Sequence, residues 1–215
     1  MYTKIDHLED IRNIKKMMEQ SSRFISLSGL SGIAAGICAI IGAIIAYPLT
    51  QFNSAISKVD DVYNDYNNRL VLKENLLGAP LVQIALLTFF AALLMAFFFT
   101  YLRSKKTKTP LWGHSARRLM IQVAIPMIAG GILILALINQ KDYKLIAPCC
   151  LIFYGLALIN ASKNTITEIK YLGYCELIIG LISLWLPGNG LFFWVLGFGV
   201  LHILYGTIMW YKYER

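Results

Sequence analysis

The stretch KYLGYCELIIGLISLWLP, residues 170–187, places a glutamate inside a run of residues that is otherwise suited to lipid. Glu176 is the only charged residue after Lys170 in this run. A run of this length and apolarity is typical of a membrane-spanning helix, and an ionisable side chain within such a helix is costly unless it is paired or protonated. The stretch therefore predicts a transmembrane helix in which some other group holds Glu176.

The composition of the whole chain is that of a membrane protein. Of 215 residues, 57% are hydrophobic and 15% are charged, whereas about a quarter of the residues in an average soluble domain are charged. The apolar residues are gathered in blocks that are too long for the elements of a soluble core. We therefore predict an all-α fold, a polytopic transmembrane bundle of six helices, with spans at residues 24–47, 79–102, 119–138, 145–161, 171–186 and 191–210.

The basic residues predict the orientation of these spans. If the amino terminus is cytoplasmic, fifteen of the 20 lysines and arginines lie on the cytoplasmic side, six of them between residues 103 and 118. Such a bias is typical of cytoplasmic loops and places both termini in the cytoplasm. The net charge of +8 is then mostly a topology signal. We expect no nucleic-acid partner, because the sequence shows no soluble basic face.

Two polar segments flank or interrupt the spans. Residues 1–23 repeat apolar side chains every three or four positions and predict a cytoplasmic amphipathic helix, which lies on the membrane surface or against a neighbouring subunit. No small-residue cleavage site follows them, so we expect no cleavable signal peptide. Residues 24–215 form the six-span transmembrane domain, and a polar outer loop is expected at about 51–78.

The first span, FISLSGLSGIAAGICAIIGAIIAY, carries small residues on two neighbouring ridges. Small residues let helix backbones approach closely in lipid. We expect this helix to lie packed at the centre of the bundle. The alternative is that its small-residue face forms a seam with a second copy or with a membrane partner. The two ridges contain Ser28, Gly32 and Gly36, and Ser31, Ala35, Ala39 and Ala43.

An internal repeat links the later spans. MIAGGILILAL around Gly131 matches ELIIGLISLWL around Gly180, and IFYGLALI at Ile152 matches ILYGTIMW at Ile203, at separations of 49 and 51 residues. Spans three and four and spans five and six are therefore predicted to be copies of one helical hairpin, with the first pair of spans as a more diverged copy.

Two stretches resemble known proteins. The hairpin that turns at LWLPGNGLFF, with a glycine in each helix, resembles the HdeD-type acid-resistance membrane proteins, which are six-span proteins of the bacterial inner membrane. The opening IRNIKKMMEQSSRFISLSGLSGIAAGI is similar to that of uncharacterised bacterial membrane proteins. Both resemblances imply a bacterial cytoplasmic (inner) membrane protein, and neither supplies catalytic residues.

Glu176 and His202 are the ionisable residues that fall inside spans, and they form the candidate site. They lie about 8 Å and 12 Å from the cytoplasmic ends of their helices, given the helical rise. Because the PGNG turn makes these helices antiparallel neighbours, we expect the two side chains to meet. Tyr174, Gln122 and Asn160 fall in the same leaflet. The set could form a ligand or proton site open to the cytoplasm, or Glu176 could be a structural brace.

The loop RSKKTKTPLWGHSARR has two interpretations. Its cations could bind anionic lipid headgroups, at about 1 kcal/mol for each residue near a charged surface, or they could serve only as the topology signal. The residues of the candidate headgroup contact are Arg103, Lys105, Lys106, Lys108, Trp112, Arg117 and Arg118.

We expect neither a metal nor a cofactor. The sequence has no HExxH, no CxxC and no pair of histidines on one span, and its four cysteines lie in apolar spans, where free thiols are expected. No nucleophile and base can be assembled into an active site. The sequence therefore predicts a non-enzymatic membrane protein with a structural, stress-related or accessory role. The alternative is a small transporter or channel with a cytoplasm-facing polar site around Glu176 and His202.

Overall fold

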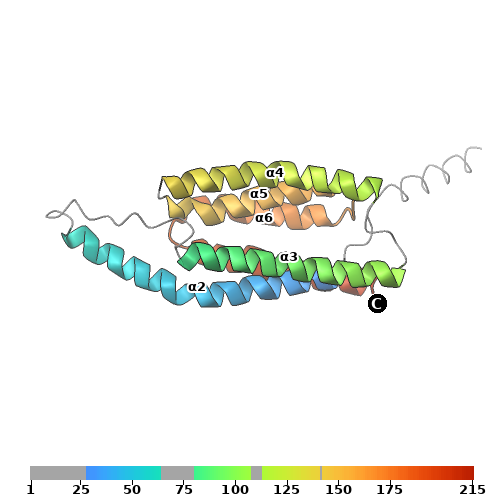
Figure 1. Ribbon diagram of the computed structural model, residues 1–215, viewed down its shortest axis with the longest axis horizontal. Helices are drawn as coiled ribbons and strands as arrows, with labels where there is room; N and C mark the ends of the chain where they lie inside the picture. Colours follow the sequence, from blue (N-terminus) through green and yellow to red (C-terminus); the bar gives the residue numbers. More distant parts are fainter. Residues whose placement is uncertain (1–27, 64–79, 108–112, 141) are drawn as a thin grey trace, which may run out of the picture.

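The computed structural model describes residues 28–63, 80–107, 113–140 and 142–215, and these residues contain helices and no strand (Figure 1). The amphipathic helix predicted for residues 1–23 lies outside them. The elements are α2 (Gly29–Tyr63), α3 (Pro80–Thr107), α4 (His114–Asn139), the short 3₁₀ turn η2 (Tyr143–Leu145), α5 (Ile146–Ala161), α6 (Ile169–Leu184), α7 (Gly190–Trp194), the π-helix η3 (Val195–Leu201) and α8 (His202–Tyr213).

Five helical stretches in the described part of the chain are long and apolar enough to cross a membrane. They coincide with five of the six predicted spans, and their bounds are Gly29–Gln51, Pro80–Thr107, Ser115–Asn139, Tyr143–Ala161 and Gly190–Tyr213. The remaining predicted span corresponds to α6, which has 16 residues. At about 1.5 Å for each residue, α6 is roughly 24 Å long, slightly less than the hydrocarbon core of a typical bilayer.

The start of the predicted outer loop is helical. Residues 51–63 continue α2, although a loop was expected from about residue 51. Pro48 lies inside α2 and does not end it, because a proline can bend a helix without terminating it. Figure 1 shows α2 changing direction in its second half. The residues after Pro48 contain neither proline nor glycine as far as Tyr63, so nothing in this segment breaks the helix.

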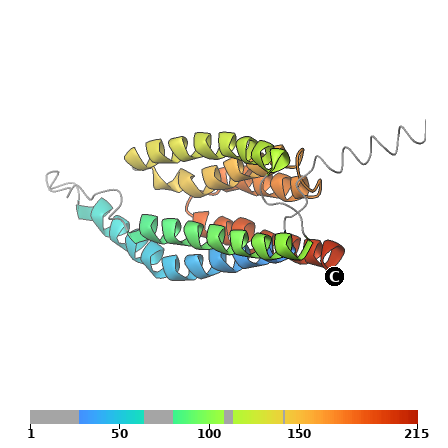
Figure 2. The same ribbon diagram turned by 45° about the vertical axis from the view of Figure 1, so that its right-hand side comes forward.

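The helices form two layers (Figures 1 and 2). One layer contains α4, α5 and α6, and α5 packs along both of its neighbours. The other contains α2 with α3 and α8 on either side. The layers meet where α5 and α6 contact α7 and η3, whereas α3 and α4 do not pack along one another. The joint between the layers is therefore formed by the beginning of the last helical stretch.

Glycines bring the helix backbones together within each layer. A Cβ atom at Gly155 of α5 would lie 2.7 Å from the carbonyl oxygen of Gly173 of α6. A Cβ atom at Gly206 of α8 would lie 2.6 Å from the carbonyl oxygen of Gly29 of α2. Both crossings are closer than any residue with a side chain permits, and such approaches are the usual basis of helix packing in lipid.

These crossings decide the packing of the first span. Gly32 faces the backbone of α8, Gly36 faces Gly199 of η3 and Ile203 of α8, and Gly42 faces Thr88 of α3. Ala39 and Ala43 are buried. The small-residue face therefore packs inside the chain, as predicted. The helix is not at the centre of the bundle, because α2 packs along α3 and α8 of its own layer and not along α4, α5 or α6.

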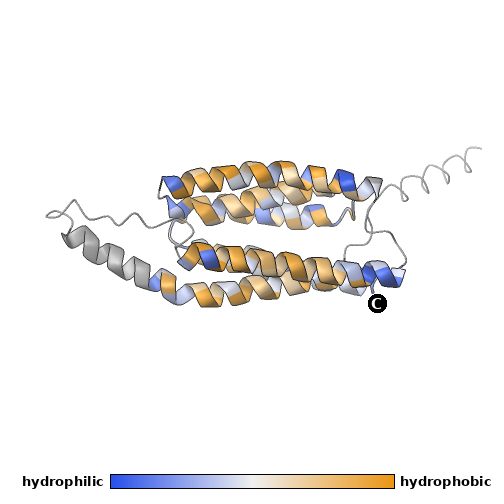
Figure 3. Cartoon of the chain, viewed as in Figure 1, coloured by the Kyte–Doolittle hydropathy of each residue, from blue (hydrophilic) through white to orange (hydrophobic). Residues whose placement is uncertain are grey.

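The outer faces of the helices remain apolar. Figure 3 shows hydrophobic residues along most of the helix length and hydrophilic residues towards the helix ends. The exposed fraction is 71% at Leu87, 65% at Leu94 and 64% at Ile132. Exposed apolar surface on this scale is unusual for a protein in water and is the surface that a lipid-facing helix presents.

The glycine crossings yield a prediction with a matched control. Gly155→Ala places its methyl group 2.7 Å from the oxygen of Gly173 and 2.8 Å from the amide nitrogen of Leu177. Because both atoms belong to backbone, α5 and α6 must separate, and we expect a loss of about 1–3 kcal/mol in the free energy of unfolding. Denaturation in detergent micelles measures this quantity.

Gly131→Ala on α4 is the control, because a Cβ atom there meets nothing within 4 Å. Alanine also favours helix over glycine by up to about 1 kcal/mol. The control should be neutral or stabilising. Equal stability of the two variants would contradict the close approach of α5 and α6.

Candidate functional site

Glu176 and His202 meet at the joint between the two layers. Glu176 lies on α6 with none of its surface exposed, and His202, the first residue of α8, is 6% exposed. His202 Nδ1 lies 3.3 Å from Glu176 Oε1. The contact expected from the sequence is therefore present, and it joins a helix of one layer to a helix of the other.

Two further hydrogen bonds orient the His202 ring. Nδ1 lies 3.1 Å from the backbone oxygen of Gly197, and Nε2 lies 2.8 Å from the hydroxyl of Tyr154 on α5. Because the carbonyl oxygen of Gly197 can only accept a hydrogen bond, Nδ1 bears a hydrogen and donates it to this oxygen. In the neutral imidazole, Nε2 then accepts a hydrogen bond from Tyr154. Glu176, His202 and Tyr154 thus form a connected polar triad.

The π-helix η3 makes room for this triad. A Cβ atom at Gly197 would lie 2.5 Å from Glu176 Oε2, so only glycine leaves space for the carboxyl group at this position. π-Helices are rare and usually occur as short segments, frequently at functional sites. In this chain the π-helix ends directly before His202. The wide turn places the Gly197 carbonyl against the ring of His202 and the Gly197 Cα beside Glu176.

The carboxyl group of Glu176 has unused hydrogen-bonding capacity. Glu176 Oε1 and His202 Nδ1 are close enough for an ion pair. The hydrogen bond of Nδ1 goes to the backbone oxygen of Gly197. Neither Glu176 oxygen has a hydrogen bond of standard geometry within the described residues. A net charge at this depth is costly. The pair carries no net charge either as carboxylate and imidazolium or as neutral carboxyl group and neutral imidazole.

The other residues predicted for the site do not join the triad. Tyr174 is 46% exposed on the outer surface of α6. Asn160 Nδ2 donates to the backbone oxygen of Gln122 at 3.3 Å, which places this pair between α4 and α5. The group that sequence reasoning did not assign to the site is Tyr154. It belongs to the Tyr-Gly pair of the repeat IFYGLALI and lies about two helical turns from the end of α5.

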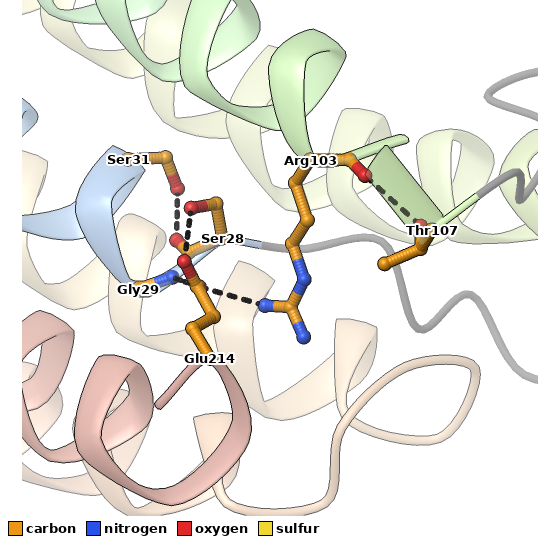
Figure 4. Close-up of polar contacts among 6 residues, drawn as sticks. All are labelled: Ser28, Gly29, Ser31, Arg103, Thr107 and Glu214. Carbon is orange, nitrogen blue, oxygen red and sulfur yellow. Dashed lines mark hydrogen bonds and ion pairs between the residues drawn. The ribbon is translucent and has the colours of Figure 1, made fainter. Parts of the chain in front are cut away.

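A second polar cluster holds the carboxyl end of α8 against α2 and α3 (Figure 4). Glu214 Oε1 accepts hydrogen bonds from the amide of Gly29 and from Arg103 at 2.8 Å, and Oε2 accepts one from Ser28 Oγ at 3.2 Å. A carboxylate at a helix amino terminus is favoured by the unpaired amides and the helix dipole. Sequence reasoning did not predict this role for Glu214.

The cations of the predicted headgroup contact separate into two groups. The Arg103 side chain is 10% exposed and pairs with Glu214, so it is engaged inside the protein. Lys105, Lys106, Arg117 and Arg118 are exposed. Lys108 and Trp112 lie outside the described residues.

A third cluster joins the turn between α5 and α6 to α8. Glu168 Oε1 accepts hydrogen bonds from Lys212 Nζ at 2.5 Å and from the Tyr213 hydroxyl at 2.6 Å. These two bonds lower the pKa of the Glu168 carboxyl to about 2, and the ionised form is therefore favoured. Glu168 and Glu214 lie at the same end of the molecule, which we call the charged end. There α2, α4 and α6 begin and α3, α5 and α8 end (Figure 1).

All four cysteines of the chain are free thiols, as predicted. Cys149 and Cys150 are neighbours on α5 and form no disulfide. Within residues 28–63, 80–107, 113–140 and 142–215, no three histidine, cysteine, aspartate or glutamate side chains come together in a way that could hold a metal ion.

No protein-family model, no curated protein and no solved structure matches this chain. The resemblance to the HdeD-type proteins therefore stays a prediction. The geometry of the triad is therefore the basis for assigning it a role.

The geometry predicts strong coupling between Glu176 and His202. His202→Phe removes the partner of a buried carboxyl group and should lower the free energy of unfolding by about 3–5 kcal/mol. Glu176→Gln removes the charge and keeps the shape, so its cost should be smaller, about 1–3 kcal/mol. The double variant should lose less than the sum, because the glutamine no longer needs a cationic partner.

A double-mutant cycle in detergent micelles measures this coupling. Tyr174→Phe, which removes an exposed hydroxyl two positions from Glu176, is the control and should change stability by less than about 0.5 kcal/mol. Additive losses in the cycle would show that the two side chains do not interact.

Proposed function

We propose that this chain is a non-enzymatic integral membrane protein with a structural, stress-related or accessory role. The observation that carries the proposal is the placement of Glu176. It is sealed at the joint between two helix layers, where it contacts His202. The partly buried ion pair of Arg103 with Glu214 also joins helices. Buried polar groups that hold helices together support the proposal that the protein acts through its shape and its contacts.

We propose that α6 crosses the membrane as a sixth span. It lies beside α5, and the glycine crossing at Gly155 and Gly173 supports similar depth for the two helices. The lysines and arginines at the charged end support the placement of this end of the molecule in the cytoplasm. Single cysteines at Lys163 and Asn189, in a variant without the four native cysteines, should react with a membrane-impermeant reagent from opposite sides. Reaction from one side would exclude a sixth span.

The bacterial inner membrane is proposed from the two family resemblances and from the same charge bias. Anionic phospholipids are the proposed contact of the charged end. The exposed side chains that support it are Lys105, Lys106, Arg117 and Arg118. Arg103 is not part of this proposed contact, because it pairs with Glu214.

A small transporter is the second candidate. The observations in its favour are the π-helix beside the triad and the two Glu176 oxygens without standard hydrogen bonds among the described residues. A carboxyl group in such a position can change its protonation during a transport cycle. The glycine-mediated packing on both sides of the triad favours the structural role instead.

Reconstitution into liposomes separates the two candidates. With a pH-sensitive dye inside the liposomes and an imposed pH gradient, the structural role predicts proton entry equal to that of protein-free liposomes. Glu176→Gln should behave in the same way. Proton entry that requires the protein and is lost in Glu176→Gln would reject the structural role and support transport.

A further inference from the structure

The two glycine crossings of this fold follow one pattern. Where α6 crosses α5, a Cβ atom at Gly180 would lie 2.8 Å from Cγ1 of Ile152. Where α2 crosses α8, a Cβ atom at Gly36 would lie 2.7 Å from Cγ1 of Ile203. In both places the glycine leaves a space on its helix, which we call the notch, and an isoleucine side chain of the neighbouring helix fills it.

The rest of each crossing matches as well. Gly173 lies seven residues before Gly180, Gly29 lies seven residues before Gly36, and all four glycines are buried. Both pairs of helices are antiparallel, because α5 and α8 end at the charged end, where α6 and α2 begin. The same helix-packing site therefore occurs twice in this chain.

α4 carries a third notch. The predicted repeat aligns GIAAG, residues 32–36, with MIAGG, residues 127–131, and gives Gly131 the place of Gly36. Gly131 is exposed, and a Cβ atom there meets nothing within 4 Å. This notch is therefore not filled by any side chain in the described part of the chain.

The apolar residue beside the third notch is exposed too. In the filled crossings, Gly206 faces Ile33 and Gly155 faces Leu177, and both apolar residues are partly buried. The corresponding residue of α4 is Ile128, which is 61% exposed. Glycine inside a helix is unfavourable unless a close approach requires it. The pattern on α4 therefore indicates a helix that packs there and is missing from the single chain.

α3 has the direction and the side chains to fill this notch. It ends at the charged end, where α4 begins, so the two helices have the antiparallel relation of the filled crossings. Phe90 and Gly131 each lie 17 residues from the charged end of their helices, at Thr107 and His114, which corresponds to about 26 Å for both. The exposed fraction of Phe90 is 56%. A bulky side chain is therefore available at the depth of the notch.

The chain holds its own α3 away from its own α4. Thr88 of α3 faces Gly42 of α2, and Arg103, near the end of α3, pairs with Glu214 beyond the end of α8. Among the described helices, α3 packs along α2 and not along α4. Closure of α3 onto α4 within one chain would have to break these contacts. A second copy can supply its α3 without breaking any of them.

We propose that two copies of this chain associate in the bilayer, with α3 of each copy packed against the Gly131 face of α4 of the other. Phe90 of one copy fills the notch at Gly131 of the other. The contact forms twice about a two-fold axis, so the assembly closes at two copies. The dimer goes beyond the proposed structural role, which does not specify a partner, and it leaves the small-residue face of α2 occupied inside each chain.

The first test measures association in liposomes. Chains labelled with a donor or an acceptor dye at the amino terminus are mixed, and Förster transfer is followed as the protein is diluted with lipid. Gly131→Leu fills the notch, and the single chain has room for the new side chain, since a Cβ atom there meets nothing within 4 Å. We expect the parent protein to form dimers and Gly131→Leu to weaken association at least tenfold.

Ile132→Ala is the matched control for this measurement. Ile132 is the next residue of α4 and is 64% exposed, but it lies about 100° around the helix from Gly131. Its substitution should leave the dissociation constant unchanged. Unassociated parent chains at every protein-to-lipid ratio, or equal association of Gly131→Leu and the parent, would overturn the proposed dimer.

The second test separates a second copy from closure within one chain. In a variant without the four native cysteines, Phe90→Cys and Gly131→Cys are introduced on separate chains of different size, which are mixed in liposomes and oxidised. A disulfide between the two chains is expected, and Ile132→Cys in place of Gly131→Cys should give at least tenfold less product. Absence of this product would overturn the dimer. When both cysteines are on one chain, a disulfide within that chain would overturn it as well.

These results are independent of the proposed structural role. Monomeric protein in liposomes would reject the dimer and leave the structural role in place. Proton entry that requires the protein would reject the structural role, whether or not the dimer forms.

Discussion

A carboxyl group sealed inside a bundle of apolar helices must have a partner, and this requirement organises the joint between the two helix layers. Glu176 contributes the carboxyl group from α6, and His202 meets it from α8 at 3.3 Å. The ring of His202 is held in turn by Tyr154 and by the carbonyl of Gly197 in the π-helix. Without these contacts, burial of Glu176 would carry an uncompensated cost. The wide turn of η3, with Gly197 inside it, leaves the space that the carboxyl group of Glu176 occupies.

Glycine contacts and polar contacts have different roles in this fold. Within each layer, backbones touch at Gly155 and Gly173 and at Gly29 and Gly206, where no specific polar group is needed. Between the layers, the polar triad fixes which residues face one another. At the charged end, Glu214 and Glu168 hold the end of α8 to α2 and to the turn between α5 and α6. The last helical stretch therefore contacts both layers along its length.

Sequence reasoning predicted the features that depend on composition and periodicity. Five helical stretches long and apolar enough to cross a membrane, the small-residue packing of the first of them and the meeting of Glu176 with His202 follow from hydropathy, small-residue spacing and the PGNG turn. The continuation of α2 past Pro48 was missed, because a proline signals a break more strongly than the following residues signal a helix. The π-helix and the roles of Tyr154, Glu168 and Glu214 were missed as well. These features depend on how helices that are distant in the sequence are rotated against one another. No local sequence pattern predicts that rotation.

The central claim is that Glu176 and His202 touch inside the helix bundle, and solid-state NMR in lipid bilayers tests it most directly. Glutamate labelled with ¹³C at the carboxyl carbon and histidine labelled with ¹⁵N at Nδ1, in a protein whose single histidine is His202, give a dipolar coupling that depends on the distance between the two nuclei. Because the labelled carbon is bonded to Oε1, which lies 3.3 Å from Nδ1, the account predicts a measurable coupling that disappears in Glu176→Gln. No measurable coupling, or a coupling that persists in that variant, would contradict it.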